Sequence, residues 1–569
     1  MIMPAQIRRG RPPEVLARSA APAAARLYPP KIMPLLAELR MYVRLLRALP
    51  RFLRRVDTPE RGRALLAERL ASREANLLRL FERAIYAHPR SPYLPLLRSA
   101  GVELGDLRRL VPELGVEGTL ERLRRAGVFV RFEQYKGRQP MVVDGREIAV
   151  AASDFFSPAV EPHLVGLSSG STGARVRHPI NFDSKAAQSP VRLAVRQAQG
   201  LLGLPQAVIV GTLPESSRFG GALEGGGPGD VPERWFTPVL SPPRRPELRF
   251  LLAHHLVMAT ARLCGVRIPP PEPLPVGEVG RVARWAADAV RRRGGAVVQG
   301  TPSMALRIAL AARREGVDLA GVVFWTGGEP MTVAKRDAIA ASGARVLSSY
   351  HMKEAGMIGA ACLAPHGPND QHVMTPHVAL VQGRREVLGR PVDALLVTQL
   401  LPTSPKVLMN VETDDYGVLE RRRCGCPLDE LGLHLHVRDV RSYAKLTTEG
   451  VTLVGSDLEQ VLERDLPARF GGSPLDYQLV EEEDADGASR VCLRVSPEVP
   501  IADEAEVIAA LRQALGRASI AADLAVRAWS HAGAIRIERV APPMSVRAKQ
   551  FPIQSRRREA ESLRVAERP

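Results

Sequence analysis

Hydroxyl and glycine residues gather in one short stretch that could bind phosphate. Glycine lets the backbone adopt positive φ and approach a ligand closely. Hydroxyl groups and successive backbone N–H groups can donate hydrogen bonds to anionic oxygens. The Gly-Lys-Ser/Thr ending of a Walker A loop is absent, and an ordinary turn is the alternative interpretation. The stretch consists of Ser168, Ser169, Gly170, Ser171, Thr172 and Gly173.

Three later stretches carry carboxylates beside glycine or an aromatic residue. They read Thr-Gly-Gly-Glu-Pro at 326–330, Tyr-His-Met-Lys-Glu at 350–354 and Thr-Asp-Asp-Tyr-Gly at 413–417. Each one alone is typical of a solvated loop or turn. With the hydroxyl-rich stretch, and in this order, they resemble the motifs of the adenylate-forming enzymes. The phenylacetate–CoA ligase-like branch is the most similar, and the resemblance runs from about residue 89 to about residue 550.

This resemblance implies an ATP-dependent, AMP-forming carboxylate ligase. Such an enzyme activates a carboxylic acid as an acyl adenylate and passes the acyl group to a thiol, here coenzyme A. The stretch 168–173 would hold the β- and γ-phosphates of ATP. Asp415 would accept both ribose hydroxyls, and Tyr350 would flank the adenine. The residues expected to border the adenine are Gly327, Gly328 and Glu329.

The resemblance also assigns the charged groups. Glu354 would bind Mg²⁺, a hard cation that prefers carboxylate oxygens. Arg441, or Arg438 if the alignment gap falls differently, would contact the ribose or a phosphate. Lys549 would reach the α-phosphate from a small mobile domain, where an ammonium group offsets developing charge. Lys353 stands where the family has a hydroxyl that faces the α-phosphate.

Departures from the family pattern leave alternatives open. Ala174 replaces the usual lysine after the phosphate loop, and His351 and Lys353 replace a glycine and a hydroxyl residue. One alternative keeps adenylation but transfers the acyl group to an amine, or to a carrier or enzyme thiol. Another is a noncatalytic relative that acts as a scaffold subunit. The sequence names neither the acid nor the oligomeric state.

Cysteine and histidine form a second group of candidate ligands. Three thiolates and one imidazole could make a closed structural Zn²⁺ site. The Cys-x-Cys spacing is tighter than the common Cys-x₂-Cys, and reduced free cysteines are the alternative. The expected ligands are Cys362, His372, Cys424 and Cys426.

Composition bounds the class of protein. The chain has 569 residues, is 45% apolar and 25% charged, and contains five cysteines, as expected of a multidomain globular protein in a reducing cytoplasm. The sequence contains no long uncharged apolar run, so we expect no transmembrane helix. The net charge is +18, and the first 60 residues hold 12 basic and 4 acidic side chains. Because no zinc-finger or RNP-type signature is present, we expect no nucleic-acid partner.

Periodicity predicts the elements that position these residues. Leucines at helical spacing over 32–56 predict a basic amphipathic helix, which could contact a membrane surface or a partner, or pack its apolar stripe on the main domain. Helix–strand alternation over 186–350 predicts an α/β fold with binding loops at the carboxyl ends of strands. We expect a helical extension at 1–88, a large domain with mixed and parallel sheets flanked by helices at 89–438, a small α+β domain at 439–555 and a charged tail at 556–569.

Overall fold

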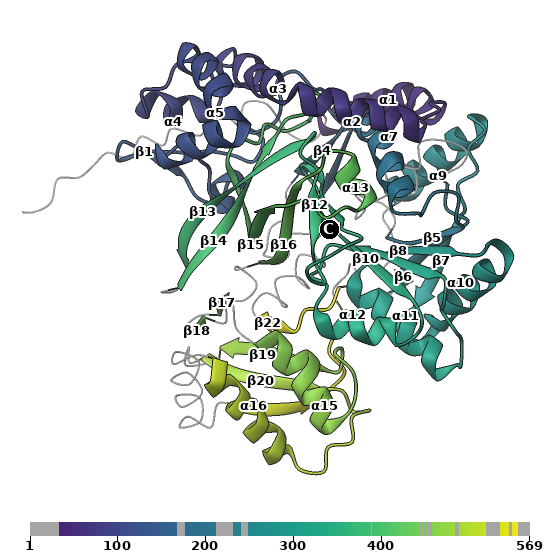
Figure 1. Ribbon diagram of the computed structural model, residues 1–569. Helices are drawn as coiled ribbons and strands as arrows, with labels where there is room; N and C mark the ends of the chain where they lie inside the picture. The colour runs from purple at the N-terminus through teal and green to yellow at the C-terminus, as the bar shows by residue number, and fades with distance from the viewer. Residues whose placement is uncertain are drawn as a thin grey trace, which may run out of the picture.

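The computed structural model describes residues 33–167, 177–211, 231–239, 248–387, 390–442, 447–448, 451–452, 458–483, 489–518, 535–544 and 549–555. Twelve strands of this described part form one large sheet (Figure 1). Their spatial order is β13 (Val378–Val387), β14 (Arg390–Gln399), β15 (Val411–Arg421), β16 (Leu435–Ser442), β12 (Gln371–Val373), β11 (Gly356–Ala361), β10 (Arg345–Met352), β9 (Val322–Gly327), β8 (Ala296–Gly300), β5 (Gln206–Ile209), β6 (Arg234–Val239) and β7 (Pro271–Pro275).

Strand β10 divides this sheet into two halves. It runs parallel to β9 and antiparallel to β11. From β10 to β7 the neighbouring strands are parallel, and from β11 to β13 they are antiparallel. The expected α/β class is therefore confirmed, with one continuous mixed sheet in the large unit.

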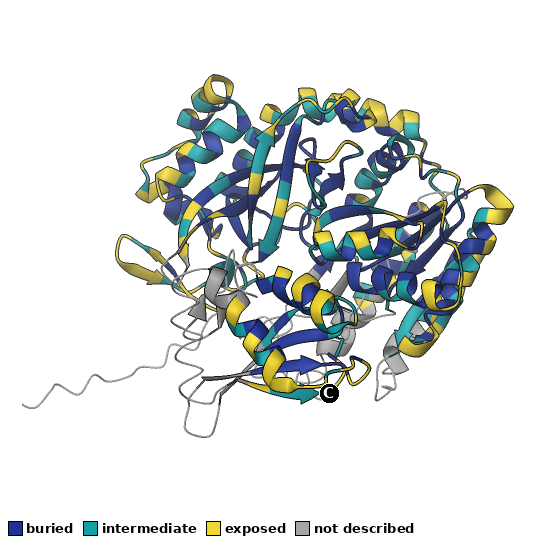
Figure 2. Cartoon of the chain, turned by 60° about the horizontal axis from the view of Figure 1, so that its bottom comes forward, coloured by how far each residue is buried: buried dark blue, intermediate teal, exposed yellow. Residues whose placement is uncertain are grey.

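Helices cover both faces of the parallel half, and its inner strands β5, β8 and β9 are almost wholly buried (dark blue in Figure 2). On β5, Ala207 and Ile209 join the core beneath α10 (Gly280–Arg293), α11 (Pro302–Arg314) and α12 (Val333–Ala340). Val208 points to the opposite core, beneath α1 (Met33–Leu53) and α9 (Leu248–Leu263). Since successive side chains of a strand alternate between faces, a strand buried on both sides is mostly apolar, and the one polar residue of β5, Gln206, bonds to Arg196 and Gln299.

The antiparallel half is covered by helices from the start of the described chain. Its core joins β13, β14 and β15 to these helices, while α7 (Phe182–Ala198) packs against α2. The covering helices are α3 (Arg73–Arg79), the π-helical η2 (Leu80–Tyr86), α4 (Tyr93–Ser99) and α5 (Leu104–Arg125), and α2 (Pro59–Ala71) packs through Leu66 on α7 and β11. Over its described part, the segment expected as a basic helical extension packs on the large unit.

The leucine-rich helix α1 packs its apolar stripe on this unit. Leu45, Leu49 and Phe52 are buried against β5, β6 and α9, which agrees with the packing interpretation and leaves membrane or partner contact unsupported. Pro50 lies inside this helix, which continues to Leu53. No helix in the described chain is long and apolar enough to span a bilayer.

A smaller unit follows β16, and its core also includes Val392 and Ala394 of β14. Its four strands lie in the order β21 (Ile535–Arg539), β20 (Ser489–Val495), β19 (Tyr477–Glu483) and β22 (Ile553–Ser555). They pack against α16 (Glu504–Ala518) and the helical run α14 (Leu458–Gln460), η4 (Val461–Asp465) and α15 (Leu466–Phe470). The large sheet runs to Ser442, past the boundary expected after residue 438.

Three short segments rich in apolar residues form no regular strand. The segment 266–268 is irregular, and the nearest strand is β7, which contains three prolines. An edge strand tolerates proline because half of its N–H groups need no partner, and β7 is an edge strand. The segments 128–130 and 406–409 contribute only isolated bridges, from Val130 to Val411 and from Lys406 to Phe156. A turn at Asp144 and Gly145 joins β1 (Met141–Val143) to β2 (Arg146–Ile148) in a hairpin.

Candidate functional site

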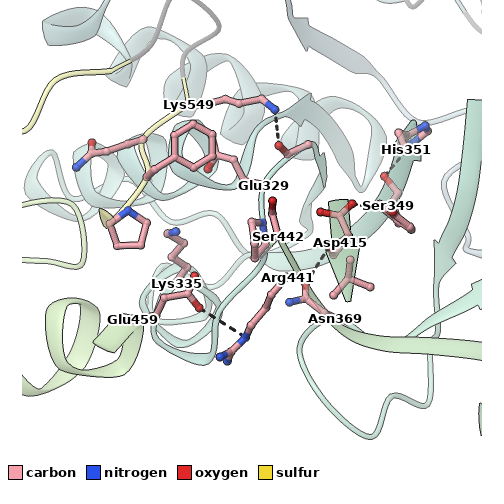
Figure 3. A pocket seen from close by; sticks show the side chains of 18 of the residues that line it. Glu329, Lys335, Ser349, His351, Asn369, Asp415, Arg441, Ser442, Glu459 and Lys549 are labelled. Carbon is pink, nitrogen blue, oxygen red and sulfur yellow. Dashed lines mark hydrogen bonds and ion pairs between the residues drawn. The ribbon is translucent and has the colours of Figure 1, made fainter. Parts of the chain in front are cut away.

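A cavity of about 220 Å³ opens where the carboxyl ends of β9 and β10 meet the small unit (Figure 3). Ligand sites of open α/β sheets usually lie at this edge. The large unit contributes the loop after β9, one residue of α12, the end of β10, the start of β12 and parts of β15 and β16, and the small unit contributes α14 and the segment 549–553. The charged residues that line the cavity are Glu329, Lys335, Asp415, Arg441, Glu459 and Lys549.

The loop after β9 needs its two glycines. A Cβ at Gly327 would lie 2.9 Å from the carbonyl oxygen of Ser349 on the neighbouring strand. Gly328 has a φ of +86°, which L side chains rarely adopt. The following carboxylate, Glu329, accepts hydrogen bonds through Oε2 from the backbone N–H of Ser303 (3.1 Å) and from its hydroxyl (2.5 Å). Glu329 therefore satisfies free N–H groups at the start of α11 and is held at the cavity wall.

Tyr350 and Asp415 meet on another wall of the cavity. The phenol of Tyr350 donates a 2.7 Å hydrogen bond to Oδ2 of Asp415. Burial and the negative charge of Asp415 raise the pKa of Tyr350 well above its usual value. The phenol therefore keeps its proton and orients the carboxylate.

Buried ion pairs join the two units beside the cavity. The ammonium of Lys335 on α12 lies 2.8 Å from Oε1 of Glu463 on η4, and both side chains are almost fully buried. Burial opposes the charge on Lys335, yet Glu463 and Glu329 outweigh it and raise its pKa. Arg441 on β16 lies 3.6 Å from Glu459 on α14. These pairs hold the small unit in the orientation that closes the cavity.

Lys549 reaches the cavity from the small unit. Its ammonium donates to the carbonyl oxygen of Gly328, as Figure 3 shows. The next residue, Gln550, donates to the carbonyl of Leu475 (2.5 Å) and accepts from Arg307 on α11. The segment that carries the lysine is therefore bound to both units.

Most of the expected nucleotide-site residues that the structure describes come together here. Gly328, Glu329, Tyr350, Asp415 and Arg441 line the cavity with Lys549, and Gly327 precedes them in the same loop. Arg438, the alternative to Arg441, pairs instead with Asp439 and Glu420. The stretch 168–173 lies outside the described residues.

Glu354 and Lys353 are not among the described residues that line this cavity. The carboxylate of Glu354 is 7% exposed and lies 2.9 Å from the ammonium of Lys136 and 3.9 Å from that of Lys406. Two cations beside one carboxylate oxygen would repel a dication placed there. In this arrangement Glu354 does not fit the magnesium site that the resemblance implies.

Several residues that line the cavity, and the two lysines beside Glu354, carry no sequence signal that we recognised. Lys335 follows an ordinary N-cap, Thr332. Asn369 lies in an irregular stretch before β12, and Gln371 is the first residue of that three-residue strand. Lys136 and Lys406 are far apart in sequence from Glu354. A lysine within an otherwise apolar segment, such as Lys406 before Val407-Leu408-Met409, is the one clue that was available.

The four expected zinc ligands converge. One donor atom from each of Cys362, His372, Cys424 and Cys426 lies within 4.8 Å of the others. Nε2 of His372 is 3.1 Å from Sγ of Cys426 and 3.5 Å from Sγ of Cys424. Nδ1 of His372 lies 2.5 Å from the carbonyl oxygen of Leu433, so it donates there and leaves Nε2 as the metal-facing acceptor. The donor set fits a tetrahedral zinc ion.

A second buried group supports this cluster. Asp370 accepts from Nδ1 of His436 (2.8 Å), from the backbone N–H of His366 (2.7 Å) and from Arg422. The ring of His436 lies 4.1 Å from that of His372 between centroids. Carboxylate and histidine partners of this kind orient metal ligands.

No protein-family model and no curated protein matches the chain. Among solved structures, a 2-hydroxyisobutyryl-CoA ligase in complex with 2-HIB-AMP and CoA is similar at 16% identity and a TM-score of 0.44, covering 88% of this chain and 93% of that chain. The anthranilate CoA ligase AuaEII is similar at 13% identity and a TM-score of 0.42, covering 71% of this chain and 68% of that chain. O-succinylbenzoate coenzyme A synthetase from Bacillus subtilis is similar at 13% identity and a TM-score of 0.37, covering 69% of each chain. TM-scores below 0.5 do not establish a family for this chain.

Proposed function

We propose that the protein is an ATP-dependent, AMP-forming carboxylate ligase that resembles the phenylacetate–CoA ligase-like branch of the adenylate-forming enzymes. One observation carries the proposal. Residues from three distant motifs, Glu329, Tyr350 and Asp415, line one cavity with Lys549 of the small unit. The three motifs follow the family's order along the sequence, and their residues also lie together at one edge of the sheet. These two observations are independent, and both support the proposal.

The first half-reaction joins two anions. The carboxylate of the acid attacks the α-phosphorus of ATP, the bond to the bridging oxygen breaks, and pyrophosphate leaves. Such a step depends on positioning and on cations that offset charge. Arg441 and Lys549 supply positive charge at the cavity, and Asp415, held by Tyr350, can accept from two ribose hydroxyls.

The second half-reaction passes the acyl group to a thiol, for which coenzyme A is our proposed acceptor. The sulfur attacks the acyl carbon, AMP leaves, and the thiol proton passes to solvent. Magnesium would accompany ATP as the counter-ion of its phosphates. Because Glu354 is paired with Lys136 and Lys406, we assign no step to a metal at that carboxylate.

The second metal in the proposal is a structural zinc ion. The residues that would hold it are Cys362, His372, Cys424 and Cys426. A closed site with four protein ligands leaves no open position for substrate, so its contribution would be to join the segments after β11 and β15.

A second candidate function is a noncatalytic nucleotide-binding subunit. The observation that favours it is the placement of Glu354 and Lys353 outside the cavity lining. A panel of carboxylic acids tested for ATP-dependent pyrophosphate release separates the two candidates. Release with at least one acid supports the ligase, and product mass with coenzyme A or amines then identifies the acceptor. AMP binding without release for any acid would favour the noncatalytic subunit.

A further inference from the structure

One short segment connects the cavity to the Cys/His cluster. Asn369 and Gln371 line the cavity, whereas Asp370 and His372 belong to the two candidate ligand groups around Cys362. Side chains alternate along extended chain. The segment that ends in β12 therefore presents every second residue to the cavity and the others to the cluster.

On the cavity side, Asn369 joins two walls. Its Oδ1 accepts hydrogen bonds from the backbone N–H of Met331 (2.9 Å) and from the hydroxyl of Ser348 (3.3 Å). Met331 follows the Gly328–Glu329 loop after β9, and Ser348 lies on β10. A displacement of Asn369 would therefore loosen both of the strand ends that form the cavity.

On the other side, the segment is held by groups of the cluster. Asp370 accepts from His436 and Arg422 through its carboxylate, and from the backbone N–H of Cys362 (3.0 Å) through its carbonyl. His372, which is fully buried, faces Cys426 at 3.1 Å. Cys424 and Cys426 lie in the segment after β15, far from His372 in the sequence. The contacts that join this segment to β12 are therefore those between the cysteine sulfurs and the imidazole of His372.

We infer that the metal centre positions the cavity wall. With zinc bound, coordination bonds would replace the weak thiol–imidazole contacts and fix His372 relative to Cys426. Asn369, three residues before His372, would then be held where it can accept from Met331 and Ser348. The inference rests on the proposed zinc and nucleotide sites, and it predicts that the two ligands strengthen each other's binding by the same factor.

Hydrogen exchange on the full chain tests this link without any nucleotide. Zinc is removed with a chelator, and exchange of the Met331 amide is compared before and after. We expect about tenfold faster exchange at Met331, with unchanged protection in β19 and β20 of the small unit. Unchanged exchange at Met331, or a purified protein that takes up no zinc, would overturn the inference.

A matched pair of variants tests the coupling itself. Cys426→Ser removes one ligand, and Cys492→Ser makes the same change at a buried cysteine of β20 outside the cluster. Equilibrium dialysis should show AMP affinity lowered about fivefold or more in the first variant and unchanged in the second. In the unaltered protein, saturating AMP should raise zinc affinity, measured by chelator competition, by the factor through which zinc raises AMP affinity.

The outcomes separate this inference from the proposed function. AMP affinity that is equal with and without zinc contradicts the coupling while leaving the nucleotide site intact. An unaltered protein that binds no AMP contradicts the proposed function, and the exchange of Met331 then still decides whether the metal centre controls the cavity wall.

Discussion

Tyr350 and Asp415 stand 65 residues apart in the sequence, yet a 2.7 Å hydrogen bond joins them at the cavity wall. The bond has one direction only, because the buried phenol keeps its proton while the carboxylate accepts. An ionised carboxylate can accept several hydrogen bonds at once.

The first prediction concerns this pair. Asp415→Ala should lower AMP affinity about tenfold or more, since a hydrogen bond to a charged group contributes roughly 1.5–3 kcal/mol. Tyr350→Phe should lower AMP affinity by a smaller factor, because the aromatic ring and the carboxylate of Asp415 remain. Isothermal titration with AMP measures both. Asp414→Asn is the control, since the φ of +70° at Asp414 is one that asparagine also tolerates. Equal losses in all three variants would contradict a specific role for Asp415.

The second prediction concerns Lys549. Lys549→Ala should greatly reduce formation of the acyl adenylate, because an ammonium near the α-phosphate is lost. It should spare thioester formation from preformed acyl adenylate. Pyrophosphate release and thioester yield measure the two half-reactions separately, and Arg547→Ala, two positions earlier, should affect neither. Normal adenylation by Lys549→Ala would show that another group supplies this charge.

The third prediction concerns the carboxylate shared by two lysines. Glu354→Gln leaves Lys136 and Lys406 buried without their counter-charge and should lower the free energy of unfolding by about 3 kcal/mol. Adding Lys406→Met should restore part of this loss, since one of the two uncompensated cations is removed. Urea denaturation of the single and double variants measures the coupling. Simple additivity would mean that the three groups do not form one electrostatic unit.

The fourth prediction gives the pH dependence of Lys406. Burial lowers the pKa of Lys406 to about 8, while the unfolded chain keeps a pKa of about 10.4. Below pH 8 Lys406 is charged in both the folded and the unfolded state, so the full free-energy cost of burying its charge is present. Between pH 8 and about 10.4 the unfolded state binds more protons, so this group makes the folded protein more stable as pH rises. The stability advantage of Lys406→Met at pH 7 should therefore shrink by roughly 3 kcal/mol by pH 10.4, and a constant difference would contradict it.

The fifth prediction is that purified protein contains close to one zinc ion per chain. Elemental analysis measures this, and thiol alkylation gives an independent reading. In the native protein Cys362, Cys424 and Cys426 should resist alkylation until a chelator is added. Free alkylation of all three in the native state, with no metal present, would dispose of the site.

Sequence reasoning found the cavity residues that lie directly at the ends of apolar strands. Glu329 and Tyr350 are of this kind, and they were named because the motifs that contain them resemble, in their order along the chain, those of the adenylate-forming enzymes. Asn369 and Gln371 could not be found this way, since a three-residue strand shows no period. The pairing of Lys136 with Glu354 bridges 218 residues, and no local pattern records such a contact. The Cys/His cluster was recovered because soft ligands are rare in this chain.

The order of the cavity residues along the chain has a consequence for synthesis on the ribosome. Lys549, Gln550 and the start of β22 close the cavity, but they emerge after every strand of the large sheet. The large unit can fold as each βα crossover appears, so for a time Glu329 and Ser303 face water with no lysine above them. A nascent chain would hold an almost complete sheet and metal cluster while lacking the residues that finish the cavity. A ligand whose binding needs Lys549 should therefore bind in the cavity only after this residue has left the ribosome.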